Sequence, residues 1–283
     1  MSRDHDLVAI GHCSRDEFPG GEWRLGGSAL YAAATSARLG ARTALVTRVG
    51  PVEREPLERS CAELGIELRA LPSNVTTTFA FRWDSSGRRI LRLRARAKRL
   101  RAADVPADLR APRAVLLGSI AHELAPDLFA AFEGSLRVLA AQGQLRAWEA
   151  DGTVRPGEWE RAEKLLSGLG AVVLSDEDVA GDPALPERWS LLVPVALTLA
   201  ERGARLLAGG KVVAEIAACR VERVVDPTGA GDAFGAGLAI ALAEGRTLED
   251  AGRFANAVAS FAVEGVGTSA LGDRQRVEAR LAG

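Results

Sequence analysis

Short apolar runs alternate along the chain with longer amphipathic stretches. The runs are five to seven residues long and rich in Val and Leu, which is typical of strands buried on both faces. The predicted strands are Leu7–Gly11, Thr43–Val49, Ala114–Gly118, Ala171–Ser175 and Leu192–Leu197. The predicted helices are Gly27–Leu39, Glu53–Leu64, Gly157–Leu169 and Leu248–Glu264. This alternation predicts an α/β fold, a mostly parallel sheet with helices on both faces.

The ends of these helices carry residues that favour them. Gly40 and Gly65 follow two helices where a left-handed C-terminal cap belongs. Pro156 suits the first turn of a third helix, where a missing N–H costs nothing. Thr247 and Asp250 resemble a capping box with Asp in place of Glu. Ligands in such folds bind beyond the carboxyl ends of the strands, so we expect a site there.

One region departs from this alternation. Apolar and basic residues alternate over Leu91–Lys98, which predicts a strand with one solvated face. Together with Thr76–Phe81 and Glu22–Leu25 it predicts a small antiparallel β lid, contributed by about residues 13–25 and 74–98. Its arginines fit either a solvated strand face or cations that attract a triphosphate.

The chain shows no internal repeat, low-complexity tract or interdomain linker. We therefore expect a single domain, residues 1–283, that carries the lid. The exposed strand edge of the lid could pair with the lid of a second copy, which would give a homodimer.

Composition narrows the classes of function. The net charge of −1 argues against a nucleic-acid partner, and no apolar stretch approaches the ~18 residues of a membrane-spanning helix. The first residues include acids and run directly into a strand, unlike a signal peptide. Three cysteines and three histidines are scattered without zinc-like spacing. We expect a cytoplasmic protein with neither nucleic acid nor membrane as partner.

The most informative stretch covers residues 224–237 and reads VVDPTGAGDAFGAG. The small residues Gly229, Ala230 and Gly231 let the backbone approach a ligand and direct successive N–H groups at one point. A helix that starts there adds its positive end. Placing Asp232 beside such an anion site is costly unless the carboxylate accepts a proton during phosphoryl transfer. The alternative is a Gly-rich cap in which Asp232 is only an N-terminal capping acid.

Gly235 and Gly237 fall inside this helix, where each costs up to ~1 kcal/mol relative to Ala. Close packing or a close ligand would compensate for that cost. The chain has neither a GxxxxGK[ST] sequence nor a GxGxxG after the first strand, which argues against a P-loop enzyme and a Rossmann dehydrogenase.

The string DPTGAGDAFGAG resembles the C-terminal signature of the ribokinase-like (PfkB) carbohydrate kinases, usually D-T-x-G-A-G-D. This chain departs from it by reading D-P-T-G. The resemblance implies that Asp232 is the catalytic base and that Gly229, Ala230 and Gly231 form an anion hole. It further implies an ATP-dependent kinase that uses Mg²⁺ to phosphorylate a hydroxyl of a small-molecule sugar or polyol.

Residues nearer the N-terminus also resemble the family. Gly26 and Gly27 open a match to its signature G-G-x-x-x-N-x-A…LG, and Asp16 stands where the family has a sugar-binding Asp. Tyr31 replaces an Asn that often contacts the sugar. The segment ending at Arg146 resembles a subgroup that includes inositol kinases. The resemblance therefore implies a substrate site made of Asp16, Gly26, Gly27, Tyr31 and Arg146.

The nucleotide side is assigned by the same resemblance. Ser175 stands at the start of the family's N-x-x-E motif, while Thr198 and Gly203 match its T-x-G-x-x-G strand. Asn256 begins a stretch that resembles the loop beside the adenine. ATP is thus expected at Ser175, Thr198, Gly203 and Asn256.

Two metal positions follow from the resemblance. Asp178 replaces the Glu of the N-x-x-E motif, so it would reach Mg²⁺ through water. A monovalent cation such as K⁺ near Asp226 is a further implication.

Two alternative functions stay open. The same scaffold accepts nucleosides, although the sequence has no obvious aromatic clamp for a base, which favours a sugar or cyclic polyol such as myo-inositol. A non-catalytic ligand-binding relative would keep the fold, but such a protein could dispense with Asp232 and its anion loop.

Overall fold

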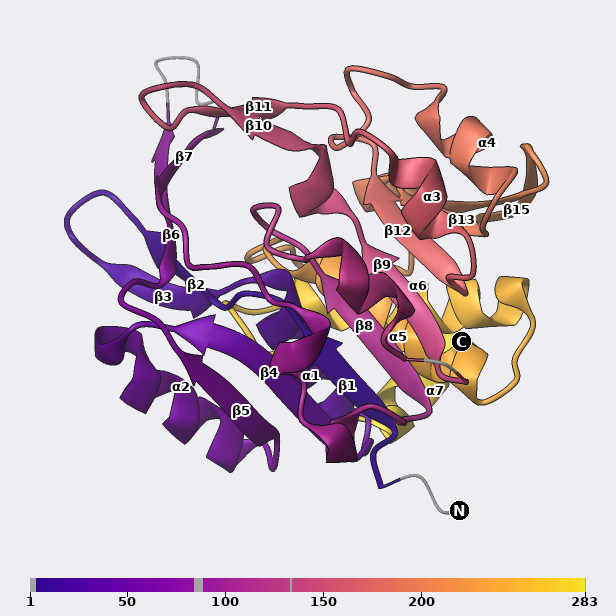
Figure 1. Cartoon of the computed structure of the whole chain (residues 1–283). Coiled ribbons are helices and arrows are strands. Elements are labelled where there is room, and N and C mark those ends of the chain that lie inside the picture. The colour runs from indigo at the N-terminus through magenta and orange to yellow at the C-terminus, as the bar shows by residue number, and fades with distance from the viewer. Residues whose placement is uncertain (1–3, 84–88, 133, 283) are drawn as a thin grey trace.

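The computed structural model describes residues 4–83, 89–132 and 134–282. Its core is a nine-stranded sheet in the order β15-β14-β13-β12-β9-β8-β1-β4-β5 (Figure 1). In that order the strands are Lys211–Ile216, Ala204–Ala208, Val195–Thr198, Ala171–Ser175, Leu136–Ala140, Ala114–Gly118, Leu7–Ile10, Thr43–Val49 and Glu67–Pro72. The pairings from β13 to β5 are parallel, and those of β14 and β15 are antiparallel.

Helices cover both faces of this sheet, as the sequence predicts. The helices are α1 Ser28–Arg38, α2 Pro51–Glu63, α3 Ala162–Leu166, α4 Leu185–Ser190, α5 Ala230–Ala243, α6 Leu248–Ala262 and α7 Arg274–Ala282. Short 3₁₀ turns are Ala102–Asp104, Ala107–Leu109, Pro126–Ala130, Gln142–Leu145 and Ala200–Arg202. Alternate strand residues point into two hydrophobic cores, one shared with α1, α2, α5, α6 and α7, the other with α3 and α4. No helix among the described residues is long and apolar enough to span a membrane.

The third predicted helix is shorter than expected. Pro156 does not start a helix but ends strand β11, Val154–Pro156, which pairs with β10, Arg146–Trp148. Gly157 packs against β10, because a Cβ there would lie 2.9 Å from the Ala147 nitrogen. The chain therefore remains part of this hairpin at Gly157. Only α3 remains of the predicted 157–169 helix.

A second, four-stranded sheet lies beside the carboxyl ends of the large one (Figure 1). Its strands, in the order β3-β2-β6-β7, are Trp23–Gly26, Ser14–Glu17, Thr77–Trp83 and Arg89–Ala95. The sequence predicted an antiparallel sheet. The pairing of β2 with β6 is parallel, however, so the sheet is mixed. Residues 84–88 of the expected 74–98 segment lie outside the described residues.

Helix α5 is made of small residues and is buried along most of its length. A Cβ at Gly235 would lie 3.3 Å from Leu116 Cδ1, under the large sheet. A Cβ at Gly237 would lie 3.0 Å from the Cα of Ala255 in α6 and 3.1 Å from Val258 Cγ2. Close packing therefore compensates for these two glycines, one of the two explanations that the sequence allows.

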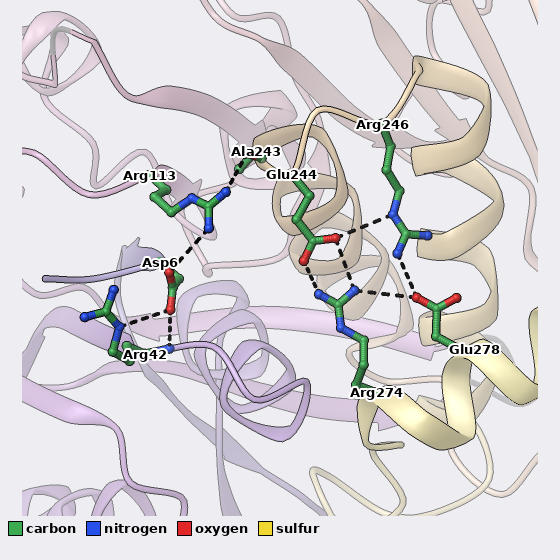
Figure 2. Close-up of polar contacts among 8 residues, drawn as sticks. All are labelled: Asp6, Arg42, Arg113, Ala243, Glu244, Arg246, Arg274 and Glu278. Atoms are coloured by element: carbon green, nitrogen blue, oxygen red, sulfur yellow. Dashed lines mark hydrogen bonds and ion pairs between the residues drawn. The ribbon is translucent and has the colours of Figure 1, made fainter. Parts of the chain in front are cut away.

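Main-chain and ionic contacts hold the carboxyl end of α5 (Figure 2). The Arg113 guanidinium donates a hydrogen bond to the Ala243 carbonyl oxygen at 3.2 Å and lies 3.9 Å from Asp6 Oδ1. Asp6 also pairs with Arg42 at 3.3 Å. A cation at the C-terminus of α5 complements the helix dipole and links α5 to the start of the sheet.

A neighbouring cluster joins α5 to α7 (Figure 2). Glu244, the residue after α5, pairs with Arg274 and lies 3.5 Å from Arg246 Nε. Glu278 of α7 lies 2.7 Å from Arg246 and 3.7 Å from Arg274. Both guanidinium groups also stack over the Phe254 ring, at 4.5 and 5.1 Å from its centroid. The last helix is thus attached through charged groups and aromatic faces.

Thr247 caps α6 as the sequence predicts, since its Oγ1 accepts a hydrogen bond from the Asp250 N–H at 3.1 Å. Thr247→Ala should lower the free energy of unfolding by about 1 kcal/mol, because it leaves an N–H of the first turn without its partner. Urea denaturation followed by circular dichroism measures the change. Thr247→Ser keeps the oxygen and should stay close to wild type, whereas equal losses in both variants would contradict a capping role.

Candidate active site

A cavity of about 700 Å³ opens between the carboxyl ends of the large sheet, the small sheet and α5. Most of the site residues expected from the sequence line it. These are Asp16, Gly27, Tyr31, Arg146, Ser175, Asp178, Thr198, Gly203, Gly229, Ala230, Gly231, Asp232 and Asn256. Gly26 and Asp226 do not line the cavity themselves, although Gly26 contacts Asp16 and Asp226 accepts a hydrogen bond from the Thr228 N–H at 2.9 Å.

The first turn of α5 faces this cavity. Gly229 is the N-cap of the helix and has φ +84°, a conformation that glycine adopts without strain. Gly231 is exposed, and a Cβ added there would meet nothing within 4 Å. N–H groups without helical partners at a helix N-terminus attract anions, which makes the space in front of Gly229 and Gly231 a candidate anion site.

Asp232 lies in this first turn and is half-buried. The pKa of its carboxyl group is raised to about 6, mainly by burial and also by the charges of Asp178 and Asp16. The Ser28 hydroxyl and the Arg146 guanidinium act in the opposite direction. A carboxyl group with a pKa near neutrality can accept and release a proton at physiological pH.

Asp16 of β2 forms the opposite wall of the cavity and is 8% exposed. The Ser14 hydroxyl donates a hydrogen bond to its Oδ1 at 2.8 Å. A Cβ at Gly26 would lie 2.2 Å from Asp16 Oδ2, and one at Gly27 would lie 2.5 Å from the His12 carbonyl oxygen. The two glycines are therefore needed for the contacts of the small sheet that hold Asp16, besides any approach of a ligand.

Tyr31 of α1 packs between the two walls and is 6% exposed. A Cβ at Gly229 would lie 2.3 Å from Tyr31 Cδ1, so the ring lies directly against the N-cap of α5. Burial raises the pKa of the phenol, and the charges of Asp16 and Asp232 raise it as well. The ring therefore supports the loop at Gly229, and its hydroxyl group stays protonated.

Arg146 of β10 reaches the same end of the cavity. Its Nη1 donates a hydrogen bond to the Ile120 carbonyl oxygen at 3.0 Å, and its guanidinium lies 5.3 Å from the centre of the Phe79 ring. Cation–π stacking of this kind orients a guanidinium while leaving its other N–H groups accessible.

Several cavity residues were not predicted from the sequence. They are Ser14, Ser28, Phe79, Phe81, Leu91, Ile120 and Gln142. Phe79 and Phe81 alternate along a predicted strand, and Ile120 and Gln142 follow the ends of buried strands, so a signal for these four was present. The sequence showed no obvious aromatic clamp for a base. In the structure, however, Tyr31, Phe79 and Phe81 all line the cavity.

Neither Arg92 nor Arg94 of β7 lines this cavity. Leu91 and Leu93 pack toward Phe79 and Phe81, whereas Arg94 and Arg96 are exposed. Among the described residues, no arginine of β7 lines the cavity. The exposure of these side chains favours the solvated-face interpretation of the Arg row.

The other end of the cavity lies over β12 and β13. The Ser175 N–H donates to Asp178 Oδ2 at 2.8 Å, and the Thr198 hydroxyl donates to the Leu174 carbonyl oxygen at 3.1 Å. Asn256 Nδ2 donates to the Ala217 carbonyl oxygen at 2.8 Å. Asn256 thus fixes the chain segment that lines this end of the cavity.

Gly203 has a similar structural role. It has φ +90°, and a Cβ there would lie 2.0 Å from the Ile216 carbonyl oxygen. Only glycine allows β14 to start this close to the end of β15, beside the cavity wall.

Comparison with known proteins gives three results. Residues 185–274 match the pfkB family of carbohydrate kinases. The nucleoside kinase of Methanothermobacter thermautotrophicus is 30% identical over 302 aligned positions, which cover 95% of this chain and 92% of that protein. The ribokinase of Bacillus subtilis is 50% identical over 74 residues, 25% of either chain.

Solved structures show the same fold. A pyrophosphate-dependent myo-inositol kinase converted to a myo-inositol-3 kinase superposes with a TM-score of 0.79 and 22% identity, covering 98% of each chain. Arabidopsis thaliana ribokinase, complexed with ribose and ATP, superposes with a TM-score of 0.76 and 21% identity over 98% of each chain.

The raised pKa of Asp232 has a consequence for stability. Its ordinary value is 3.8 and its folded value about 6, so ionisation disfavours the folded state above that pH. Asp232→Asn should therefore raise the melting temperature at about pH 8, and the gain should shrink as the pH falls from about 6 to about 4. Asp108→Asn, at an exposed position, serves as control in calorimetry at each pH. A gain that is the same at all pH values would contradict the raised pKa.

Proposed function

The chain belongs to the pfkB family of carbohydrate kinases, and on this basis we propose that it transfers the γ-phosphoryl group of ATP to a hydroxyl of a small sugar or cyclic polyol. One observation carries the proposal. Asp232, with a pKa raised to about 6, lies in the first turn of α5, at an anion site that opens on the cavity. A proton acceptor and a phosphate site at one point are what transfer to a hydroxyl requires.

In the proposed mechanism Asp232 takes the proton of the acceptor hydroxyl. The acceptor oxygen forms its bond to the γ-phosphorus while the bond between that phosphorus and the ADP oxygen breaks. General-base catalysis of this kind contributes about 10²–10⁴ in rate. The main-chain N–H groups of Gly229 and Gly231 stabilise the negative charge on the transferring group, while the Ala230 N–H donates to the Pro227 carbonyl oxygen at 3.2 Å.

Cations would act on the donor side. Asp178 is a second carboxylate on the cavity wall, and hard oxygen ligands of this kind suit Mg²⁺ held mainly by phosphate oxygens. Asp178 would hold the ion through water, since its Oδ2 already accepts from the Ser175 N–H. When bound, Mg²⁺ would neutralise charge on the phosphates. A monovalent cation such as K⁺ near Asp226 stays a proposal from the family resemblance.

The acceptor would lie between Asp16 and Asp232, under the small sheet. Asp16 presents oxygens that accept hydrogen bonds from hydroxyl groups, and Arg146 provides donors. Closure of the small sheet over this end would exclude water and suppress hydrolysis of ATP.

A nucleoside is a second candidate acceptor. Tyr31, Phe79 and Phe81 bring aromatic surface to the same end of the cavity, and such rings bind a base by stacking. The full-length similarity to a nucleoside kinase points in the same direction.

A homodimer through the small sheet would have to use β3. The β7 edge is bridged by the chain's own β10–β11 hairpin, because the Leu93 N–H donates to the Gly152 carbonyl oxygen at 2.8 Å. An ion pair between Arg92 and Asp151, 2.9 Å, supports the same contact. Edge strands that are already paired offer no main-chain groups to a second copy.

Asp232→Asn tests the catalytic proposal. The amide keeps the shape but cannot accept the proton, so turnover should fall by two or more orders of magnitude. ADP release is measured with a panel of myo-inositol, pentoses, hexoses and nucleosides, and ATP binding by calorimetry. Binding of ATP should persist, and near-normal turnover by the variant would overturn the role of Asp232. If nucleosides alone react, the acceptor part fails and the kinase part stands.

Asp16→Ala tests acceptor recognition. A lost hydrogen-bond partner of charged type is worth about 1.5–3 kcal/mol, so the acceptor KM should rise roughly 10- to 150-fold. The ATP KM should change little, because Asp16 lies at the opposite end of the cavity from Asn256. Steady-state kinetics with each substrate varied in turn separates the two constants. An equal rise in both would place Asp16 outside the acceptor site.

A further inference from the structure

A fully buried carboxylate lies beside the acceptor end of the cavity without lining it. Glu123 follows β8 in the sequence and is 0% exposed. Its oxygens accept hydrogen bonds from the N–H groups of His12 at 3.2 Å, Ile120 at 2.9 and 3.0 Å and Ala121 at 2.8 Å, and from the Ser119 hydroxyl at 3.2 Å.

These hydrogen bonds explain why a charge can be buried here. An ionised carboxylate without partners would cost several kcal/mol in a protein interior, and main-chain N–H donors offset that cost. The donors converge only if residues 119–122 fold back over the carboxylate. His122 has φ 55°, which is uncommon for a residue other than glycine. The conformation of this loop is therefore imposed by its contacts, among which Glu123 is central.

The same loop holds Arg146 at two points. The Ile120 carbonyl oxygen accepts a hydrogen bond from Arg146 Nη1 at 3.0 Å, and His122 Nε2 donates to the Arg146 carbonyl oxygen at 2.6 Å. A Cβ at Gly143 would lie 2.3 Å from the Ile120 nitrogen, so the turn before Arg146 packs directly on the loop. Ile120 thus fixes the guanidinium of Arg146, and His122 fixes its main chain.

We propose that Glu123 is a positioning residue, which sets the 119–122 loop and through it places the Arg146 guanidinium beside the acceptor and Asp232. The part that concerns the acceptor rests on the proposed kinase function. The part that concerns Asp232 depends only on the fold, because Arg146, Asp178 and Asp16 are the charged groups that act on its carboxyl.

Glu123→Gln tests the proposal without any substrate. The amide offers one acceptor oxygen, and its NH₂ group would face N–H donors, so the loop must rearrange. Removal of a negative charge would by itself lower the pKa of Asp232, whereas displacement of Arg146 would raise it. We expect a rise of about one unit, read from the Asp232 carboxyl ¹³C shift in a pH titration of the full chain.

Arg146→Gln should produce a rise at least as large, and adding Glu123→Gln to it should cause no further rise, because the upward effect acts through one guanidinium and only the loss of the negative charge, which lowers the pKa, remains. Glu53→Gln is the matched control, since Glu53 is also buried, at 4% exposure, and pairs with Arg15 and the Thr76 hydroxyl outside the cavity. It should lose stability and leave the pKa of Asp232 unchanged. Ser119→Ala removes one donor to Glu123 and should shift the pKa upward by less, which keeps the test valid if Glu123→Gln does not fold.

Kinetics adds a second readout, with the acceptor of highest kcat/KM in the panel above. Glu123→Gln should raise the acceptor KM at least tenfold and leave the ATP KM unchanged. An unchanged or lowered pKa of Asp232, or effects that add to those of Arg146→Gln, would overturn the proposal. If the wild type phosphorylates nothing in the panel, the proposed function fails, but the titration still decides the role of Glu123.

Discussion

The close packing of α5 against the large sheet and α6 is the constraint on which the site depends. Gly235 lies under Leu116 and Gly237 lies on the Ala255 backbone, at separations that leave no space for larger residues. The helix can therefore neither rotate nor slide without loss of these contacts. Its first turn is held at the cavity as a result, and with it Asp232 and the N–H groups that attract an anion.

The pKa of Asp232 results from opposing effects of its surroundings. Burial and two neighbouring carboxylates favour the protonated form, while Arg146 and Ser28 favour the ionised form. A stronger cation contact would make the carboxylate a weaker base, and a weaker contact would leave it protonated at neutral pH. For the proposed general-base role of Asp232, the position of Arg146 is therefore as important as the position of Asp232 itself.

Continuous apolar runs predicted five strands of the large sheet, among which β4, β8 and β12 begin and end where the sequence placed them, but they did not predict the central strand β9. Local patterns also located the α5 motif and the Thr247 cap. The predicted 157–169 helix was too long, since only α3 forms within it and Pro156 belongs to a hairpin whose pairing with Arg146 is decided by tertiary contacts. For the same reason the burial of Glu123 could not be predicted, since it depends on hydrogen bonds from residues that follow two different strands.

The last helix differs from the others in what attaches it. Within α7 only Val277 is fully buried. Its other contacts include the ion pairs drawn in Figure 2, and the Arg274 guanidinium also lies over the Phe254 ring. Dissolved ions screen interactions of this kind far more than apolar burial. Amide hydrogens of α7 should therefore exchange with solvent deuterium faster as ionic strength rises, while those of α5 keep their protection. The chain would then have a terminal segment whose local unfolding is set by salt and a catalytic core that is insensitive to it.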